Sequence, residues 1–237
     1  MKYLIFGATC EIGIGLIKEI INKDDDPSFI ISSSSEDRLK SLEELLDQRN
    51  INYRTLILDF NKFDIEKILF LKDLKINYIY FFSAFTELEN GKVSYEYLVK
   101  SLNINSTSIL KITNFLLETI KENVYSVNFI SSIAAGTNKK RNYIYSSSKI
   151  MVEHYFKSLM HYFEYSKPYI KIYRLGILSN KNQKNKFLST KCELVSKFLY
   201  KCQNSKKSKM YYFPRKWSLL IFIISLIPKF LMKKINF

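Results

Sequence analysis

A tyrosine and a lysine four residues apart, Tyr145 and Lys149, form the pair in this sequence with the clearest chemical use. On a helix, residues four apart share a face, so the phenol and the ammonium would point the same way. A nearby cation favours the phenolate and lowers the tyrosine pKa from its usual value of about 10. Such a tyrosine can protonate a carbonyl oxygen as hydride reaches the carbon, or take the proton back in the reverse direction.

The same spacing occurs at Tyr212 and Lys216, and the surroundings separate the two pairs. Tyr145 lies near the start of a long predicted helix, and Ser132 lies thirteen residues before it at the end of a predicted strand. Tyr212 has Leu199 at the corresponding place. The Ser132 hydroxyl would donate a hydrogen bond to the substrate oxygen and stabilise the charge that develops there.

A glycine loop follows the first predicted strand and leads into a predicted helix. It reads Gly7-Ala8-Thr9-Cys10-Glu11-Ile12-Gly13. Backbone N–H groups in such a loop can approach a pyrophosphate, and the helix N-terminus adds a partial positive charge. The loop therefore predicts dinucleotide binding, with an ordinary strand-to-helix turn as the alternative interpretation.

The end of the second predicted strand bears on the choice of dinucleotide. NAD binders carry an acid there, which holds the ribose 2′-hydroxyl. This chain has a serine run at 32–35, followed by Arg38. Because Ser33, Ser34 and Arg38 could hold a 2′-phosphate, we expect NADP(H) to be favoured, with NAD(H) as the alternative cofactor. The serine run could also be simply a polar turn.

The elements that must position these residues alternate along the chain. Strands are predicted at 4–6, 29–31, 53–58, 76–82, 127–130 and 169–175, and helices at 12–22, 36–48, 105–121 and 143–165. Because these strands do not alternate between apolar and polar residues, this rhythm predicts an α/β fold with a Rossmann-type, doubly wound parallel sheet. Such sheets bind ligands beyond the carboxyl ends of their strands, where the strand order reverses.

The loop and the tyrosine–lysine–serine set together resemble the short-chain dehydrogenase/reductase family, over residues 2–179. The resemblance implies that Tyr145 is the acid/base, that Lys149 tunes it and holds the nicotinamide ribose, and that Ser132 polarises the carbonyl. It also implies a helix-borne asparagine that positions a water in a proton relay. By spacing this is Asn105, with Asn103 as the competing choice, and Asn105 could instead cap its helix.

The resemblance implies further cofactor contacts along the chain. Asp59 would contact the adenine, although capping of the next helix is an equal interpretation. Two motifs depart from the family pattern: Glu11 replaces a glycine, and Phe82-Ser83-Ala84-Phe85 keeps only the alanine of Asn-Asn-Ala-Gly. The expected cofactor-binding residues are Gly7, Thr9, Cys10, Glu11, Ile12, Gly13, Ser33, Ser34, Arg38, Asp59, Phe60, Ser83, Ala84, Tyr145, Lys149, Gly176 and Ile177.

The composition is that of a folded chain, with 47% hydrophobic and 25% charged residues among 237. We expect one catalytic domain at 1–203 and a basic, apolar helical extension at 204–237. The net charge of +15 suggests anionic partners, but we find no base-reading basic helix or zinc-finger spacing and expect no nucleic acid. Three cysteines without a CxxC pair and two histidines predict no metal site and a cytoplasmic location.

Two segments bear on the substrate side. The basic loop at 137–141 could bind a phosphate or pyrophosphate, or could be a solvated loop. The apolar run at 217–227 is shorter than the ~20 residues that span a bilayer. Its flanking cations and Trp217 suit a helix at the membrane surface within 215–237, and packing against the core or a second subunit is the alternative. The polar stretch at 179–191 is predicted to be a loop.

The tail and the glycine loop resemble those of bacterial reductases that act on polyprenyl-linked keto-sugars. The resemblance implies a small-molecule or lipid-linked carbonyl substrate, a homo-oligomer, and a location at the inner face of the membrane. Two other functions stay open at this point. They are a nucleotide-sugar epimerase or dehydratase, which is generally longer, and a non-catalytic dinucleotide-binding or membrane-recruited scaffold protein.

Overall fold

The computed structural model describes residues 1–87, 93–137, 142–179 and 189–227. Seven parallel strands form one sheet in the order β3-β2-β1-β4-β5-β6-β9. The strands are β1 (Lys2–Phe6), β2 (Ser28–Ser33), β3 (Asn52–Ile57), β4 (Tyr78–Phe81), β5 (Ser126–Ser132), β6 (Tyr169–Leu175) and β9 (Lys209–Phe213). The order reverses between β1 and β4, so the predicted doubly wound α/β fold is confirmed.

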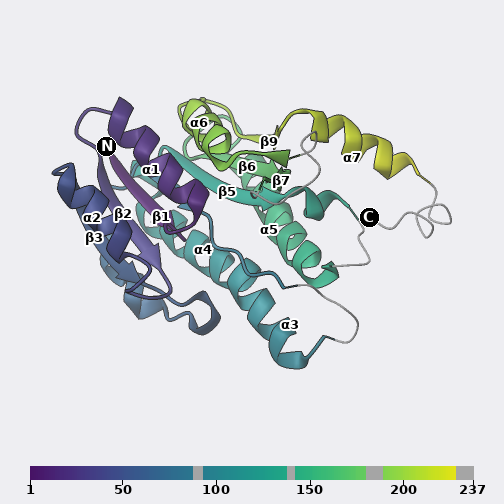
Figure 1. Cartoon of the computed structure of the whole chain (residues 1–237), viewed down its shortest axis with the longest axis horizontal. Coiled ribbons are helices and arrows are strands. Elements are labelled where there is room, and N and C mark those ends of the chain that lie inside the picture. The colour runs from purple at the N-terminus through teal and green to yellow at the C-terminus, as the bar shows by residue number, and fades with distance from the viewer. Residues whose placement is uncertain (88–92, 138–141, 180–188, 228–237) are drawn as a thin grey trace.

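Helices cover both faces of the sheet (Figure 1). They are α1 (Glu11–Lys23), α2 (Lys40–Gln48), α3 (Tyr95–Leu102), α4 (Ser108–Ile120), α5 (Tyr143–Tyr162), α6 (Cys192–Gln203) and α7 (Lys216–Leu226). Shorter helical segments are η1 (Phe60–Lys62), η2 (Ile65–Asp73), η3 (Asn103–Thr107), η4 (Lys121–Asn123) and η5 (Ile133–Gly136), and β7 (Ile177–Leu178) pairs with β8 (Ser189–Thr190).

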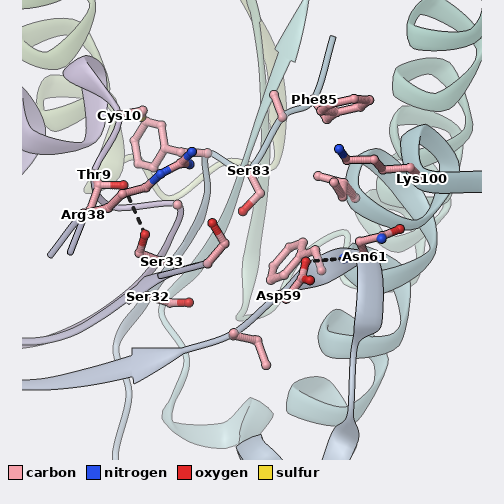
Figure 2. Close-up of a pocket in the computed structure, with 17 residues that line it drawn as sticks. Thr9, Cys10, Ser32, Ser33, Arg38, Asp59, Asn61, Ser83, Phe85 and Lys100 are labelled. Carbon is pink, nitrogen blue, oxygen red and sulfur yellow. Dashed lines mark hydrogen bonds between the residues drawn. The ribbon is translucent and has the colours of Figure 1, made fainter. Parts of the chain in front are cut away.

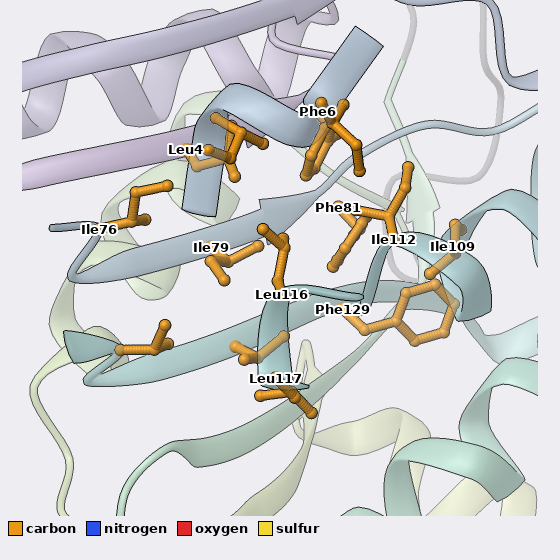
Figure 3. Packing of buried hydrophobic residues seen from close by; sticks show 14 of the residues in the cluster. Leu4, Phe6, Ile76, Ile79, Phe81, Ile109, Ile112, Leu116, Leu117 and Phe129 are labelled. Carbon is orange, nitrogen blue, oxygen red and sulfur yellow. The ribbon is translucent and has the colours of Figure 1, made fainter. Parts of the chain in front are cut away.

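Strand β1 shows how the sequence builds two cores. Leu4 and Phe6 point to one face of the sheet and join the cluster formed with α4, α5 and η2. Tyr3 and Ile5 point to the other face and join the cluster formed with α1, α2 and α6. Alternate residues of a strand face opposite sides, so a strand covered on both faces must be apolar throughout. Figure 3 shows the first of these clusters between the sheet and α4.

Three predicted helices begin or end at least three residues from their predicted bounds, and the sheet extends past the predicted end of the catalytic domain. The helix expected at 105–121 is the second half of a longer helical segment that begins at Tyr95, and η3 within it is a π-helix. The helix expected at 36–48 begins at Lys40, and the one expected at 143–165 ends at Tyr162. Strand β9 pairs with β6, so the sheet continues past residue 203, where we expected the catalytic domain to end.

The tail expected as an apolar extension forms α7, which packs on the sheet through one side only. Trp217 and Ile221 form a small buried cluster with Ile133 of η5. Leu219 is 63% exposed and Ile223 is 48% exposed, on the side of the helix away from this cluster. Within the described ranges, the structure contains no helix that is long and apolar enough to cross a membrane.

Candidate active site

A cavity of about 800 Å³ lies beyond the carboxyl ends of β1, β2 and β4, where the strand order reverses. Its lining residues are Gly7, Thr9, Cys10, Ser32, Ser33, Ser34, Arg38, Leu58, Asp59, Phe60, Asn61, Phe82, Ser83, Ala84, Phe85, Lys100 and Ile104 (Figure 2). Ten of these are predicted cofactor residues, so the structure brings segments from four parts of the chain to one place. The volume falls within the range of small-molecule sites.

The glycine loop approaches β4 closely. Gly7 has a φ of +72°, and a Cβ built there would lie 2.8 Å from the backbone nitrogen of Ser83. A Cβ at Gly13 would lie 2.7 Å from the carbonyl oxygen of Ala8, so Gly13 lets α1 start against the loop. The Cys10 Sγ caps α1 by accepting a hydrogen bond from Gly13 N at 3.3 Å. Gly7, Thr9 and Cys10 therefore supply the loop's side of the cavity.

Three loop residues predicted to bind the cofactor are not among the residues that line the cavity. Glu11 is exposed on the first turn of α1, and Ile12 is buried in the core beneath it. Their backbone groups and that of Gly13 still form the N-terminal turn of α1, the helix end that can attract a phosphate.

The serine run and Arg38 occupy one side of the cavity (Figure 2). The hydroxyls of Thr9 and Ser33 lie 3.4 Å apart and can share a hydrogen bond, which joins the glycine loop to the end of β2. The Asp59 carboxylate caps η1 by accepting from Asn61 N at 2.8 Å, as one of its two interpretations expects. Asp59 also lines the cavity, and its contact with the adenine stays a prediction.

Lys100 and Phe85 line the opposite side of the cavity, and neither was among the predicted site residues. The Lys100 ammonium lies 4.4 Å from the Phe85 ring centroid, a cation–π distance. Figure 2 shows Arg38 and Lys100 on opposite sides of the cavity. No sequence pattern marks Lys100 as a site residue, because the chain is rich in lysine. Its position at the cavity depends on Phe85, which comes from another segment.

Tyr145 and Ser132 meet as predicted. Tyr145 lies on the first turn of α5, Ser132 ends β5, and their side chains are hydrogen-bonded. Burial raises the pKa of Tyr145 to about 12, and the hydrogen bond to Ser132 opposes this rise. The predicted fall in the pKa is therefore wrong for this structure, because the loss of hydration in the buried site outweighs the hydrogen bond to Ser132.

Lys149 is 1% exposed and reaches the edge of the cavity. Its Nζ donates to the carbonyl oxygens of Ile130 at 3.2 Å and Ser83 at 3.4 Å, and Ser83 lines the cavity. The ammonium lies 5.8 Å from the centroid of the Tyr145 ring. Burial lowers the pKa of Lys149 to about 8, and the Glu153 carboxylate opposes this fall.

Asn105 is fully buried in η3, and both polar atoms of its side chain bind the backbone of Phe85; its place in a proton relay stays a prediction. Its Oδ1 accepts from Phe85 N at 2.7 Å, and its Nδ2 donates to Phe85 O at 2.7 Å. The side chain thus holds the segment after β4, where the glycine turn of the family motif is missing. Asn103, the competing choice, donates to the carbonyl oxygen of Asn61 at 3.2 Å.

The remaining predicted residues lie on the substrate side or outside the described ranges. Gly176 and Ile177 do not line the cavity, and Gly176 lies beneath Trp217: a Cβ there would be 2.1 Å from the indole nitrogen. Most of the predicted basic loop, residues 138–141, and most of the predicted polar loop, residues 180–188, fall outside the described residues.

No known family model matches the chain, and no curated protein sequence matches it. Solved structures do match. The chain is similar to a serine dehydrogenase from Escherichia coli, with TM-score 0.73 and 17% identity over 90% of this chain and 95% of that one. A short-chain dehydrogenase from Streptomyces avermitilis gives TM-score 0.76 and 14% identity over 94% and 93%.

A third match is a short-chain dehydrogenase from Sphingobium yanoikuyae in complex with NADPH, with TM-score 0.74 and 13% identity over 96% of each chain. The order of strands and the cavity at their reversal point define a doubly wound, Rossmann-type α/β fold. Within that class, these matches show that the chain has the short-chain dehydrogenase/reductase fold.

Proposed function

We propose that this protein is an NAD(P)H-dependent oxidoreductase that reduces a carbonyl group by hydride transfer. The observation that carries the proposal is the arrangement of three side chains, one of which reaches a residue that lines the cavity. Tyr145 and Ser132 are hydrogen-bonded to each other, and the Lys149 ammonium binds the carbonyl of Ser83 at the cavity's edge. A carbonyl placed beside the two hydroxyls would receive its proton from Tyr145 and a stabilising hydrogen bond from Ser132.

The protonation state of Tyr145 favours carbonyl reduction over alcohol oxidation. With a pKa of about 12, Tyr145 keeps its proton at neutral pH and can donate it to the oxygen of a carbonyl. Alcohol oxidation would need the phenolate, which burial disfavours. When bound, a nicotinamide cofactor supplies the hydride. Gly7, Thr9 and Cys10 would hold its pyrophosphate, and Asp59 and Phe60 would flank its adenine.

The test of the proposal is NADPH consumption, followed by absorbance, with a panel of small ketones and keto-sugars. Saturable turnover with at least one carbonyl would support it. A folded protein that binds neither NADPH nor NADH would contradict it. Binding without turnover across the panel would favour a non-catalytic dinucleotide-binding protein.

We expect NADPH to bind more tightly than NADH, because Ser33, Ser34 and Arg38 lie together on one side of the cavity. Replacing Arg38 by Gln would remove a charge-assisted hydrogen bond to the 2′-phosphate, and such bonds contribute about 1.5–3 kcal/mol. NADPH affinity should fall about 10- to 100-fold while NADH affinity changes little, as measured by fluorescence titration. An Arg38→Gln variant that weakens both cofactors equally would contradict this assignment.

Activity should fall as the pH rises through about 8. Lys149 carries its charge below its pKa of about 8 and loses it above, whereas Tyr145 stays protonated throughout this range. The kcat/KM for NADPH-dependent reduction reports the free enzyme and should show this alkaline limb. Lys149→Arg should abolish the limb, since arginine keeps its charge. A wild-type profile that stays flat to about pH 10 would contradict the prediction.

We further propose that α7 contacts the inner face of an anionic membrane and that the carbonyl substrate is lipid-linked. The exposed side of α7 carries Leu219, Phe222, Ile223 and Leu226, a spacing that places four large apolar side chains on one side of a helix. Arg215 and Lys216 at its start are exposed and suit anionic head groups. A homo-oligomer remains part of the proposal through the family resemblance.

The membrane contact is tested with vesicles that contain phosphatidylglycerol. Replacing both Leu219 and Ile223 by Glu should reduce vesicle co-sedimentation at least about tenfold, because two charges enter the apolar stripe. The matched control replaces Ile65 and Leu69, also exposed and four residues apart on η2, and should bind as the wild type does. Equal vesicle binding by the Leu219/Ile223 variant and the Ile65/Leu69 control would contradict the proposed membrane contact.

A further inference from the structure

A buried ion pair lies directly behind the catalytic residues. Glu153 of α5 is fully buried and Arg174 of β6 is 6% exposed. The Arg174 Nη2 lies 2.5 Å from Glu153 Oε2, and its Nε donates to Oε1 at 2.8 Å. Ser131 Oγ also donates to Oε1, at 2.6 Å. The carboxylate therefore ties α5 to both β5 and β6.

Stability alone does not explain this pair. Removing two charges from water costs several kcal/mol per ion, and apolar residues of similar volume often stabilise a protein equally well. Most of the described core around the sheet is apolar. A pair of charges at this one place therefore points to a role in the neighbouring site.

The pair touches every element that carries a catalytic side chain. Ser131 immediately precedes Ser132 on β5, and Glu153 lies one helical turn after Lys149 on α5. The Arg174 guanidinium also supports η5, the segment that follows Ser132: a Cβ built at Gly136 would be 2.6 Å from Nη1. Nη1 in turn donates to the Tyr212 hydroxyl of β9 at 3.1 Å.

We propose that the buried Glu153–Arg174 pair is a positioning element of the active site, which presents a negative charge to the Lys149 ammonium and fixes β5 at Ser132. This inference rests on the proposed reductase function. Glu153 and Arg174 act through Lys149, Ser131 and η5.

The surroundings of Lys149 show why the carboxylate matters. Carbonyl oxygens of Ser83 and Ile130 accept from its Nζ, and the Phe129 ring of β5 lies 4.9 Å away. On α5 itself, Lys149 has Tyr145 on one side and Glu153 on the other. Burial lowers the pKa of Lys149, and the Glu153 carboxylate opposes that effect. Beyond Glu153, the Arg174 guanidinium and the Tyr212 phenol complete the set of titratable groups.

The test compares Glu153→Gln with Glu153→Asp, which keeps the charge. The Gln variant should keep NADPH affinity within about threefold but lose about tenfold or more in kcat. In the Gln variant, the fall of kcat/KM at alkaline pH should begin at a lower pH than in the wild type. In Glu153→Asp, this fall should begin at the same pH as in the wild type. The control is Glu193→Gln, which removes an ion pair of the same 2.5 Å length to Lys197 on the exposed side of α6. That control should leave kcat and the limb unchanged.

A folded Glu153→Gln variant with wild-type kcat and an unmoved limb would overturn the proposal. If Glu153→Gln does not fold, because Arg174 is left buried without its partner, the double variant Glu153→Leu with Arg174→Met removes both charges at similar volume. This double variant should fold, bind NADPH and show the same loss and the same displaced limb. A wild-type profile in the double variant would likewise overturn the proposal.

A stability cycle separates this inference from the reductase proposal, since it needs no turnover. Denaturation midpoints are measured for wild type, Glu153→Gln, Lys149→Met and the combined variant at about pH 6.5 and about pH 9.5. The two changes should be non-additive at the lower pH, where the Lys149 ammonium faces the carboxylate. They should be additive at the higher pH. Additivity at both pH values would overturn the positioning role, even if the protein proves to be an active reductase.

Discussion

Replacing Tyr145 by Phe should lower kcat/KM for carbonyl reduction by about 10²- to 10⁴-fold, the range expected when a general acid is removed. The change removes only the hydroxyl that is hydrogen-bonded to Ser132, so the ring keeps its place in the buried site. NADPH affinity should stay close to that of the wild type, because Tyr145 is not among the residues that line the cavity. Single-turnover measurements of NADPH oxidation would separate the chemical step from binding.

The control for this experiment is Tyr143→Phe. Tyr143 starts the same helix but is 47% exposed, so loss of its hydroxyl should leave the rate unchanged. If Tyr145→Phe retained more than about a tenth of the wild-type rate, another group would have to donate the proton and the proposed mechanism would fail.

Replacing Gly7 by Val should weaken NADPH binding at least about 100-fold and destabilise the fold by about 2–4 kcal/mol. At a φ of +72°, a β-branched side chain is strained, and its Cβ would overlap the backbone of Ser83. The loop and the end of β4 would have to separate, which moves both walls of the cavity. Calorimetric titration with NADPH and chemical denaturation would measure the two effects.

Gly15→Ala provides the matched control from the following helix. A Cβ there would meet only the Ser196 side chain, at 2.4 Å from its Oγ and 3.1 Å from its Cβ, so α6 would have to adjust while the glycine loop keeps its shape. NADPH affinity should therefore stay within about threefold of the wild type. Equal losses in the Gly7 and Gly15 variants would show that general destabilisation, and not the shape of the loop, weakens the cofactor.

The sequence was sufficient for most of the sheet because β1, β2, β4, β5 and β6 are short runs that are buried on both faces, whereas β3 is a partly exposed edge strand. It missed β9, whose residues are half-buried at the sheet edge and follow a lysine-rich stretch that reads as a tail. It also missed α6, although Val195 and Leu199 have the spacing of one helix face. Both elements owe their place to packing on β6 and α1 more than to a strong local pattern.

The features of the site also fall into those that the sequence predicts and those that it does not. The glycine loop, the serine run and the Ser132–Tyr145–Lys149 set could be predicted, since each depends on spacing within one segment. The Asn105–Phe85 hydrogen bonds and the Lys100–Phe85 contact join different segments of the chain, so no local sequence pattern predicts them. The Glu153–Arg174 pair is of the same kind, with partners on α5 and β6.

The contact between Gly176 and Trp217 links the end of β6 to the first turn of α7. Since any side chain at position 176 would overlap the indole, Gly176 can be replaced only if Trp217 changes or moves. Relatives of this protein that keep a tryptophan at the start of the tail helix should therefore keep glycine after the sixth strand. Relatives with a larger residue there should carry a tail that is shorter or that takes another path.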